Sequence, residues 1–209
     1  MYTFTHLEDF IKNLYSQLSI VYPHEINIME IARKLNIKLE YWDETSQVTY
    51  YKGKFLICIN EELSPQEQWQ DFAHELGHVF RHDGCQSSMS NQFRQLQENE
   101  ADNFGYHFYI PSFILLNYEI SSYVNIKDGV PFVMKTFNVT EEFAIERLRQ
   151  FKRRIQQAKM DEEHRRYMDA LYPKAPPYSD ETNEVLKQLS IILEKKRGYT
   201  VNATTKTLS

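Results

Sequence analysis

Residues 74–82 read HELGHVFRH, which places three histidines four residues apart and a glutamate directly after the first of them. On an α-helix, side chains at positions i and i+4 lie one turn apart on the same face. His74 and His78 can therefore bind one Zn²⁺ ion, for which imidazole nitrogens are common ligands. Glu75 then lies beside the open coordination position, where a carboxylate can act as general base in hydrolysis. The stretch predicts a catalytic zinc site.

The other interpretation of this stretch is a helix that carries histidines for structural reasons. On a helical wheel of residues 65–82, His74 and His78 lie opposite the apolar side, so they are not core histidines. The apolar side consists of Trp69, Phe72, Ala73, Leu76 and Phe80. From average residue usage, a chance HExxH pattern in a chain of this length is about a one-in-a-hundred event. Both observations favour the metal site.

A catalytic zinc ion needs a third protein ligand and keeps its fourth position open. His82 lies about 12 Å along the helix axis from His74, too far to share a metal ion. We therefore expect His82 to have a structural role or to contact a ligand at the rim of the site. The candidates for the third ligand are Glu98 and Glu100, in the stretch QLQENEADNFGYHFYIP of the next helix.

The helical wheel of this second stretch separates the two glutamates. Glu100 points toward the side predicted to be buried, whereas Glu98 and Asp102 stand together on the opposite side, one turn apart. The side predicted to be buried consists of Phe93, Leu96, Phe104 and Phe108. We therefore predict Glu98 as the third ligand and Asp102 as the acceptor for the free N–H of a liganding histidine.

The stretches FAHELGHVFRH and ENEADNFGYHFYIP resemble the motifs of the ImmA/IrrE family of metallopeptidases. The family pattern is AHElgH, then ExxAxxFA, then an apolar pair and proline. HExxH followed after 19 residues by the glutamate of an ExxxD pattern is also similar to the gluzincin arrangement. The resemblance covers roughly residues 26–150, including FNVTEEFAIERLRQF as closing helices. Gly105 replaces the usual alanine and HFYIP a commoner aliphatic run, and neither change affects a predicted ligand.

This resemblance implies a zinc-dependent endopeptidase, with one Zn²⁺ per chain, that cleaves a helix-turn-helix repressor and so derepresses a phage or mobile element. An oxyanion-stabilising tyrosine or histidine is usual in such sites, and the candidates by position are Tyr106, His107 and Tyr109. The alternative is a non-catalytic anti-repressor or a toxin/antitoxin-type binding protein with a structural zinc site. Glu75 argues against this alternative, because a structural site has no use for a general base.

The sequence patterns around these residues predict an α+β fold. We expect a mainly helical zincin-like domain in which a small antiparallel sheet precedes the HExxH helix. IKLEYW and VTYYKGKFLICIN predict strands, with a hairpin at Lys52 and Gly53. We expect KFLICIN to be an edge strand that pairs with an extended substrate. The capping-box pattern Ser64-Pro65-Gln66-Glu67 predicts the start of the zinc helix. Helices are expected at 65–82, 91–109, 113–122, 126–136 and 140–170, after two within the first 36 residues.

The composition along the chain predicts two parts. Residues 1–155 are expected to form the metallopeptidase domain, and residues 156–209 a C-terminal helical extension. Within the extension, PKAPPYSD predicts a linker at 173–180, and Val185, Leu189 and Ile192 predict an amphipathic helix. The last residues, GYTVNATTKTLS, are expected to be a disordered tail.

The overall composition favours a soluble cytoplasmic protein. The net charge of −5 argues against direct nucleic-acid binding, which needs a basic face. Two cysteines, Cys58 and Cys85, are typical of a reduced protein of the cytosol. The start of the chain lacks the pattern of a secretion signal, and no run of 18 apolar residues predicts a membrane span.

Overall fold

The computed structural model describes residues 2–82, 89–118, 126–172 and 177–204. It divides into two compact units, residues 1–161 and 162–209. The first unit contains the sheet and both motif helices, and confirms the predicted fold class, mainly helical α+β with a small sheet before the HExxH helix. Whether the chain folds as separate domains with a boundary at 155 stays a prediction.

Three short helices form the beginning of the first unit: α1 (His6–Leu18), η1 (Pro23–Glu25) and α2 (Ile28–Lys34). Helix α1 begins with a capping box in which the Thr5 hydroxyl accepts from the Glu8 N–H and the Glu8 carboxylate accepts from the Thr5 N–H. It ends at Ser19, whose φ of 55° is left-handed. The buried face of α1 has the spacing of one helical stripe and consists of Ile11, Leu14, Tyr15 and Leu18.

The sheet consists of β1 (Lys38–Trp42), β2 (Gln47–Tyr51) and β3 (Lys54–Asn60), in the order β1-β3-β2. The hairpin of β2 and β3 is antiparallel as predicted, and its two-residue turn has φ of 50° at Lys52 and 82° at Gly53. Strand β1 pairs with β3 in parallel, however, so the sheet is mixed and not antiparallel throughout. Strand β3 lies in the centre because it is the most apolar strand, with Ile57 and Ile59 fully buried.

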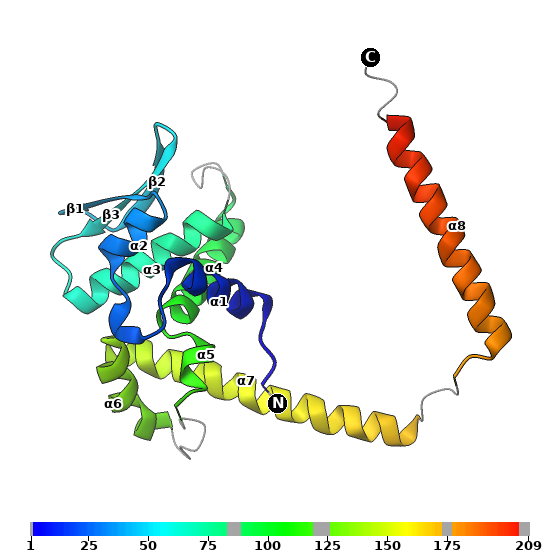
Figure 1. Cartoon of the computed structure of the whole chain (residues 1–209). Coiled ribbons are helices and arrows are strands. Elements are labelled where there is room, and N and C mark those ends of the chain that lie inside the picture. Colours follow the sequence, from blue (N-terminus) through cyan, green and yellow to red (C-terminus); the bar gives the residue numbers. More distant parts are fainter. Residues whose placement is uncertain (1, 83–88, 119–125, 173–176, 205–209) are drawn as a thin grey trace. The chain divides into compact units, whose positions relative to one another are not determined.

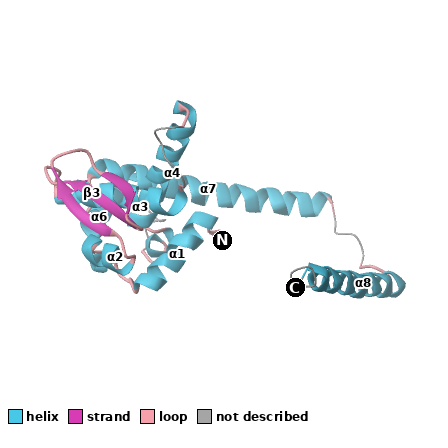
Figure 2. Ribbon diagram, turned by 90° about the horizontal axis from the view of Figure 1, so that it is seen from above, coloured by secondary structure: helices cyan, strands magenta, loops and turns pink. Residues whose placement is uncertain are grey.

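Helices α3 (Pro65–Arg81) and α4 (Asn91–Tyr109) carry the two sequence motifs. Helix α3 starts as predicted, with Pro65 in its first turn and a reciprocal capping box between Ser64 and Glu67. Figure 1 shows the three strands side by side next to α2 and α3, and Figure 2 shows the same small sheet among the surrounding helices. The apolar face of α3 packs on the sheet and on α4, and its histidines lie beside α4 outside the apolar cluster of the core.

The remaining helices of the first unit are α5 (Ser112–Leu115), α6 (Ile126–Phe137) and the first part of α7 (Glu141–Leu171). The helix predicted at 113–122 is short, because only residues 112–115 are helical and 119–125 lie outside the described residues. Helix α7 buries Ala144, Leu148 and Phe151 at helical spacing. Within the described ranges, no helix has the length and apolar character needed to cross a membrane.

The second unit contains α8 (Asp180–Thr204), in which the predicted helix is found. Helix α8 runs on to Thr204 and so includes residues that the sequence predicted as a disordered tail. Residues 173–179 of the predicted linker lie between α7 and α8, whereas its last residue, Asp180, begins α8; residues 173–176 are outside the described part. Of the two cysteines, Cys58 is a buried free thiol on β3, and Cys85 is not among the described residues.

Candidate metal centre

Three side chains from α3 and α4 converge on one point. The Nε2 atoms of His74 and His78 lie 3.1 Å apart, and Glu98 Oε2 lies 3.3 Å from the first and 3.5 Å from the second. Ligand atoms at about 2.0–2.1 Å from a tetrahedral zinc ion are about 3.3 Å from one another. Two imidazoles and one carboxylate are also a donor set of catalytic zinc sites. The spacing and chemistry of the cluster therefore fit zinc, and within the described residues it is the group that could hold a metal ion.

The orientation of His74 is fixed by a carboxylate behind it. His74 Nδ1 lies 2.7 Å from Asp102 Oδ1, one turn beyond Glu98 on α4. A carboxylate can only accept, so the Nδ1–H of His74 donates to Asp102 and its Nε2 keeps a free lone pair. That lone pair faces His78 Nε2 and Glu98, which is where a bound ion would lie.

Glu75 lies beside the cluster without belonging to it. Its side chain is buried with 7% exposure, and this burial raises the pKa of Glu75 to about 7. The charge of His74 and a hydrogen bond from the backbone N–H of Val48 on β2 oppose this rise. A carboxyl group with a pKa near neutrality can both accept a proton and return it, as a general base requires. For His78, burial and the neighbouring His74 lower the pKa and favour the neutral imidazole that a metal needs.

The three candidates for oxyanion stabilisation have different surroundings. Tyr106 follows Asp102 by one turn on α4, on the same face as Glu98, and its ring packs on Phe143 with centroids 4.5 Å apart. Burial and then the charge of Asp102 raise the pKa of the Tyr106 phenol. Tyr109 is 1% exposed and packs among aromatic rings, and its hydroxyl has no hydrogen-bond partner among the described residues. Tyr106 is thus the better placed of the two tyrosines, and its role stays a prediction.

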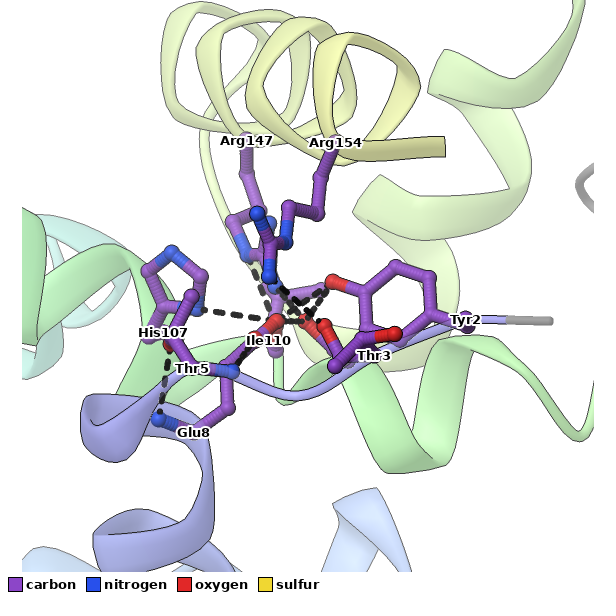
Figure 3. Close-up of polar contacts among 9 residues, drawn as sticks. Tyr2, Thr3, Thr5, Glu8, His107, Ile110, Arg147 and Arg154 are labelled. Carbon is purple, nitrogen blue, oxygen red and sulfur yellow. Dashed lines mark hydrogen bonds and ion pairs between the residues drawn. The ribbon is translucent and has the colours of Figure 1, made fainter. Parts of the chain in front are cut away.

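The third candidate, His107, lies in a buried polar cluster that ties the start of the chain to α4, α5 and α7 (Figure 3). Its Nδ1 is 3.8 Å from Glu8 Oε1, and Glu8 also accepts from Tyr2 and Ser112. Arg147 completes the cluster through bonds of 2.9 Å to the Ile110 carbonyl and 2.6 Å to Ser112 Oγ. Burial and then the charge of Arg147 lower the pKa of His107 to about 3. These contacts give His107 a structural setting apart from the predicted metal ligands.

The structure corrects the predicted faces of α4. Phe93 and Leu96 were expected to be buried, but each is 50% exposed, because the first turns of α4 are not covered by other described elements. Glu100 was expected to point toward that buried side, but its carboxylate lies 3.2 Å from Nε2 of His82. His82 in turn contacts the ring of His78, the predicted ligand one turn before it.

A glycine between the two histidines allows the two helices to come close enough for Glu98 to reach them. A Cβ atom at Gly77 would lie 2.9 Å from Cα of Ala101, closer than real contacts allow. We expect Gly77→Ala to destabilise the fold by about 1–3 kcal/mol through overpacking and to weaken zinc binding, because α4 must move away from α3. Thermal unfolding and a zinc titration measure the two effects.

Gly105→Ala is the matched control for this substitution. A Cβ atom at Gly105 meets its nearest neighbour, the His74 backbone nitrogen, at 3.5 Å, which is an ordinary contact. We expect this variant to keep the stability and zinc affinity of the unmodified chain. Equal zinc affinity in the Gly77 and Gly105 variants would show that the close helix crossing does not support the metal site.

Known proteins resemble this chain over the part that holds the cluster. Residues 24–149 match the family of M78 peptidases, described as the IrrE N-terminal-like domain. The phage-like element PBSX protein XkdA of Bacillus subtilis (strain 168) is 41% identical over 150 residues, which are 72% of this chain and 75% of that protein. The uncharacterized protein YqaB of the same strain is 36% identical over 156 residues, 75% of this chain and 90% of its own.

A solved structure also has a similar fold. A Mycobacterium tuberculosis transcriptional regulator superimposes with a TM-score of 0.51 and 16% sequence identity. The match covers 68% of this chain but only 46% of the regulator, so the chain spans less than half of that protein. At this identity the likeness concerns the fold alone.

Proposed function

Because this chain belongs to the M78 peptidase family with the IrrE N-terminal-like domain, we propose that it is a zinc-dependent endopeptidase that cleaves a helix-turn-helix repressor and thereby derepresses a phage or mobile element. The observation that carries the proposal is the cluster of His74, His78 and Glu98 with the buried carboxyl of Glu75 beside it. The name of the relative XkdA, which assigns that protein to a phage-like element, supports the biological setting.

The chain's own residues divide the chemistry among them. A zinc ion bound by His74, His78 and Glu98 would supply a Lewis acid that polarises a peptide carbonyl and activates water. Glu75 accepts one proton from the attacking water as the new C–O bond forms at the carbonyl carbon. It then gives that proton to the amide nitrogen as the C–N bond breaks, so that an amine and a carboxylic acid leave. The pKa of about 7 for Glu75 suits both transfers.

Within the described residues the edge strands of the sheet are β1 and β2, so an extended substrate would pair with one of these and not, as the sequence predicted, with β3; β2 is the one closer to Glu75. Strand β3 pairs on both sides, with β1 and β2, and has no free edge. In β2, the backbone N–H of Val48 lies close enough to the Glu75 carboxylate to lower its pKa, so this strand reaches the proposed general base. An extended peptide that adds to the edge of β2 by main-chain hydrogen bonds would place a carbonyl beside Glu75.

Main-chain hydrogen bonds do not distinguish one substrate sequence from another. Specificity must therefore come from side-chain pockets and from docking of a larger surface. We therefore expect slow or undetectable cleavage of short generic peptides and efficient cleavage of one folded repressor. Measuring kcat/KM for a peptide library, for casein and for the repressor in parallel tests this expectation. Digestion of casein and repressor at comparable rates would contradict it.

A further inference from the structure

His82 continues the row of histidines on α3 by one more turn. Its side chain is 8% exposed, and it stands at the C-cap of the helix, where its ring lies against that of His78 with centroids 5.0 Å apart. Its Nδ1 is 2.9 Å from Nδ1 of His78, and its Nε2 is 3.2 Å from Oε2 of Glu100 on α4. A chain of polar contacts therefore runs from His78 through His82 to Glu100.

The chemistry of these atoms fixes which atom donates and which accepts in each of these two hydrogen bonds. A neutral histidine that coordinates through Nε2 carries its proton on Nδ1. The Nδ1–H of His78 can donate to Nδ1 of His82 only if that atom holds a lone pair, which places the His82 proton on Nε2. This second proton points at Glu100, whose carboxylate can only accept. Each hydrogen bond then has one donor and one acceptor, and the Nε2 lone pair of His78 points toward His74 and Glu98.

We propose that His82 and Glu100 are positioning residues that hold His78 in the Nδ1–H tautomer needed for metal binding. The inference rests on the metal centre proposed above. Under this proposal a carboxylate of α4 orients each liganding histidine. Asp102 bonds to His74 directly, and Glu100 acts on His78 through the imidazole of His82. Glu100 lies about 200° around the helix from Glu98 and Asp102, so it faces away from their side. The His82 ring therefore bridges the gap between His78 and the Glu100 carboxylate.

Loss of this support has a specific consequence. The His78 side chain is only 10% exposed, so an Nδ1–H that loses its acceptor is not readily satisfied by water. The proton then favours Nε2, where it blocks coordination. Outer contacts of this kind typically change metal affinity by about 10–100-fold.

Zinc affinity of the full chain, measured by competition with a chromophoric chelator, tests the proposal. His82→Leu removes the acceptor with little change in size, and we expect it to weaken zinc binding by roughly 10–100-fold, as Asp102→Asn should on the other arm. His82→Gln offers a side-chain oxygen to the His78 N–H and should restore most of the affinity. Glu100→Gln also keeps an acceptor and should have a smaller effect than His82→Leu. His24→Leu, at an exposed histidine that stacks on Tyr22, is the matched control and should change nothing.

A structural role of His82 would give another pattern, because a buried leucine should then be tolerated better than glutamine. Zinc binding by His82→Leu at the affinity of the unmodified chain would overturn the proposal while leaving the metal centre intact. An unmodified chain that binds no zinc would instead overturn the metal centre, and the positioning role with it.

Nitrogen-15 NMR of the zinc-loaded unmodified chain gives an answer even if His82→Leu does not fold. Long-range proton–nitrogen spectra distinguish the two neutral tautomers of each imidazole ring. We expect the Nδ1–H tautomer for His78 and the Nε2–H tautomer for His82. A proton on Nδ1 of His82 would leave His78 without this acceptor and would overturn the proposal.

Discussion

Replacement of Glu75 by glutamine should abolish peptide cleavage while the fold, the zinc content and the affinity for the repressor stay unchanged. Glutamine has nearly the same shape as glutamate, but it cannot accept the proton of the attacking water. Loss of a general base typically lowers the rate by 10²–10⁴-fold, and we expect about the upper end of this range because Glu75 is the carboxyl group buried beside the predicted ligands. Single-turnover cleavage of the repressor, with metal analysis of the same sample, measures the effect.

Asp71→Asn is the matched control for the Glu75 variant, since it also neutralises a carboxylate on α3, one turn earlier. Its charge raises the pKa of Glu75 less than burial does, and it leaves the Glu75 carboxylate in place, so its effect on the cleavage rate should be far smaller. A Glu75→Gln variant that cleaves at nearly the unmodified rate would place the proton acceptor on another residue. If that variant still induces the mobile element in cells without cleavage, the protein acts as a binding module.

The second large effect is expected at the predicted metal ligands. The unmodified chain should carry about one zinc ion, and His74→Ala, His78→Ala and Glu98→Gln should each lose it, together with the peptidase activity. Glu100→Gln should retain zinc, because Glu100 contacts His82 and not the cluster. Elemental analysis after exhaustive dialysis gives the zinc content. Loss of zinc in Glu100→Gln and its retention in Glu98→Gln would show that the third ligand is assigned wrongly.

Thermal unfolding provides an independent measurement of the same variants. A ligand that binds only the folded state stabilises it by about 2.7 kcal/mol at a concentration 100-fold above its dissociation constant. Added zinc should therefore raise the Tm of the unmodified chain and of Glu100→Gln. The Tm of the three ligand variants should not respond to zinc or to a chelator.

Local patterns made much of the fold predictable. The capping box of Ser64 and Glu67 places the start of α3, and the two-residue turn at Lys52 and Gly53 places the hairpin. Both are set by residues within a few positions of one another. The convergence of His74, His78 and Glu98 follows from the periods of two helices that must pack on each other. Their catalytic roles are chemical hypotheses that the experiments above decide.

Contacts between distant residues could not be predicted in the same way. The period of two in β1 is the same whether that strand pairs in parallel or antiparallel, so the mixed sheet was missed. The position of His107 on α4 gives no sign that Glu8, 99 residues earlier in the chain, lies beside it. The exposure of Phe93 depends on what covers the first turn of α4, and helical spacing alone does not contain that information.

The most direct test of the proposed peptidase is the mass spectrum of its proposed substrate, a helix-turn-helix repressor, taken after incubation with the zinc-loaded protein. We expect two fragments whose masses add up to that of the intact repressor plus one water molecule. The same incubation with Glu75→Gln should leave the repressor at its full mass. A repressor that stays intact with the zinc-loaded unmodified chain, while the two proteins bind each other and repression is relieved, would contradict the assignment as a peptidase.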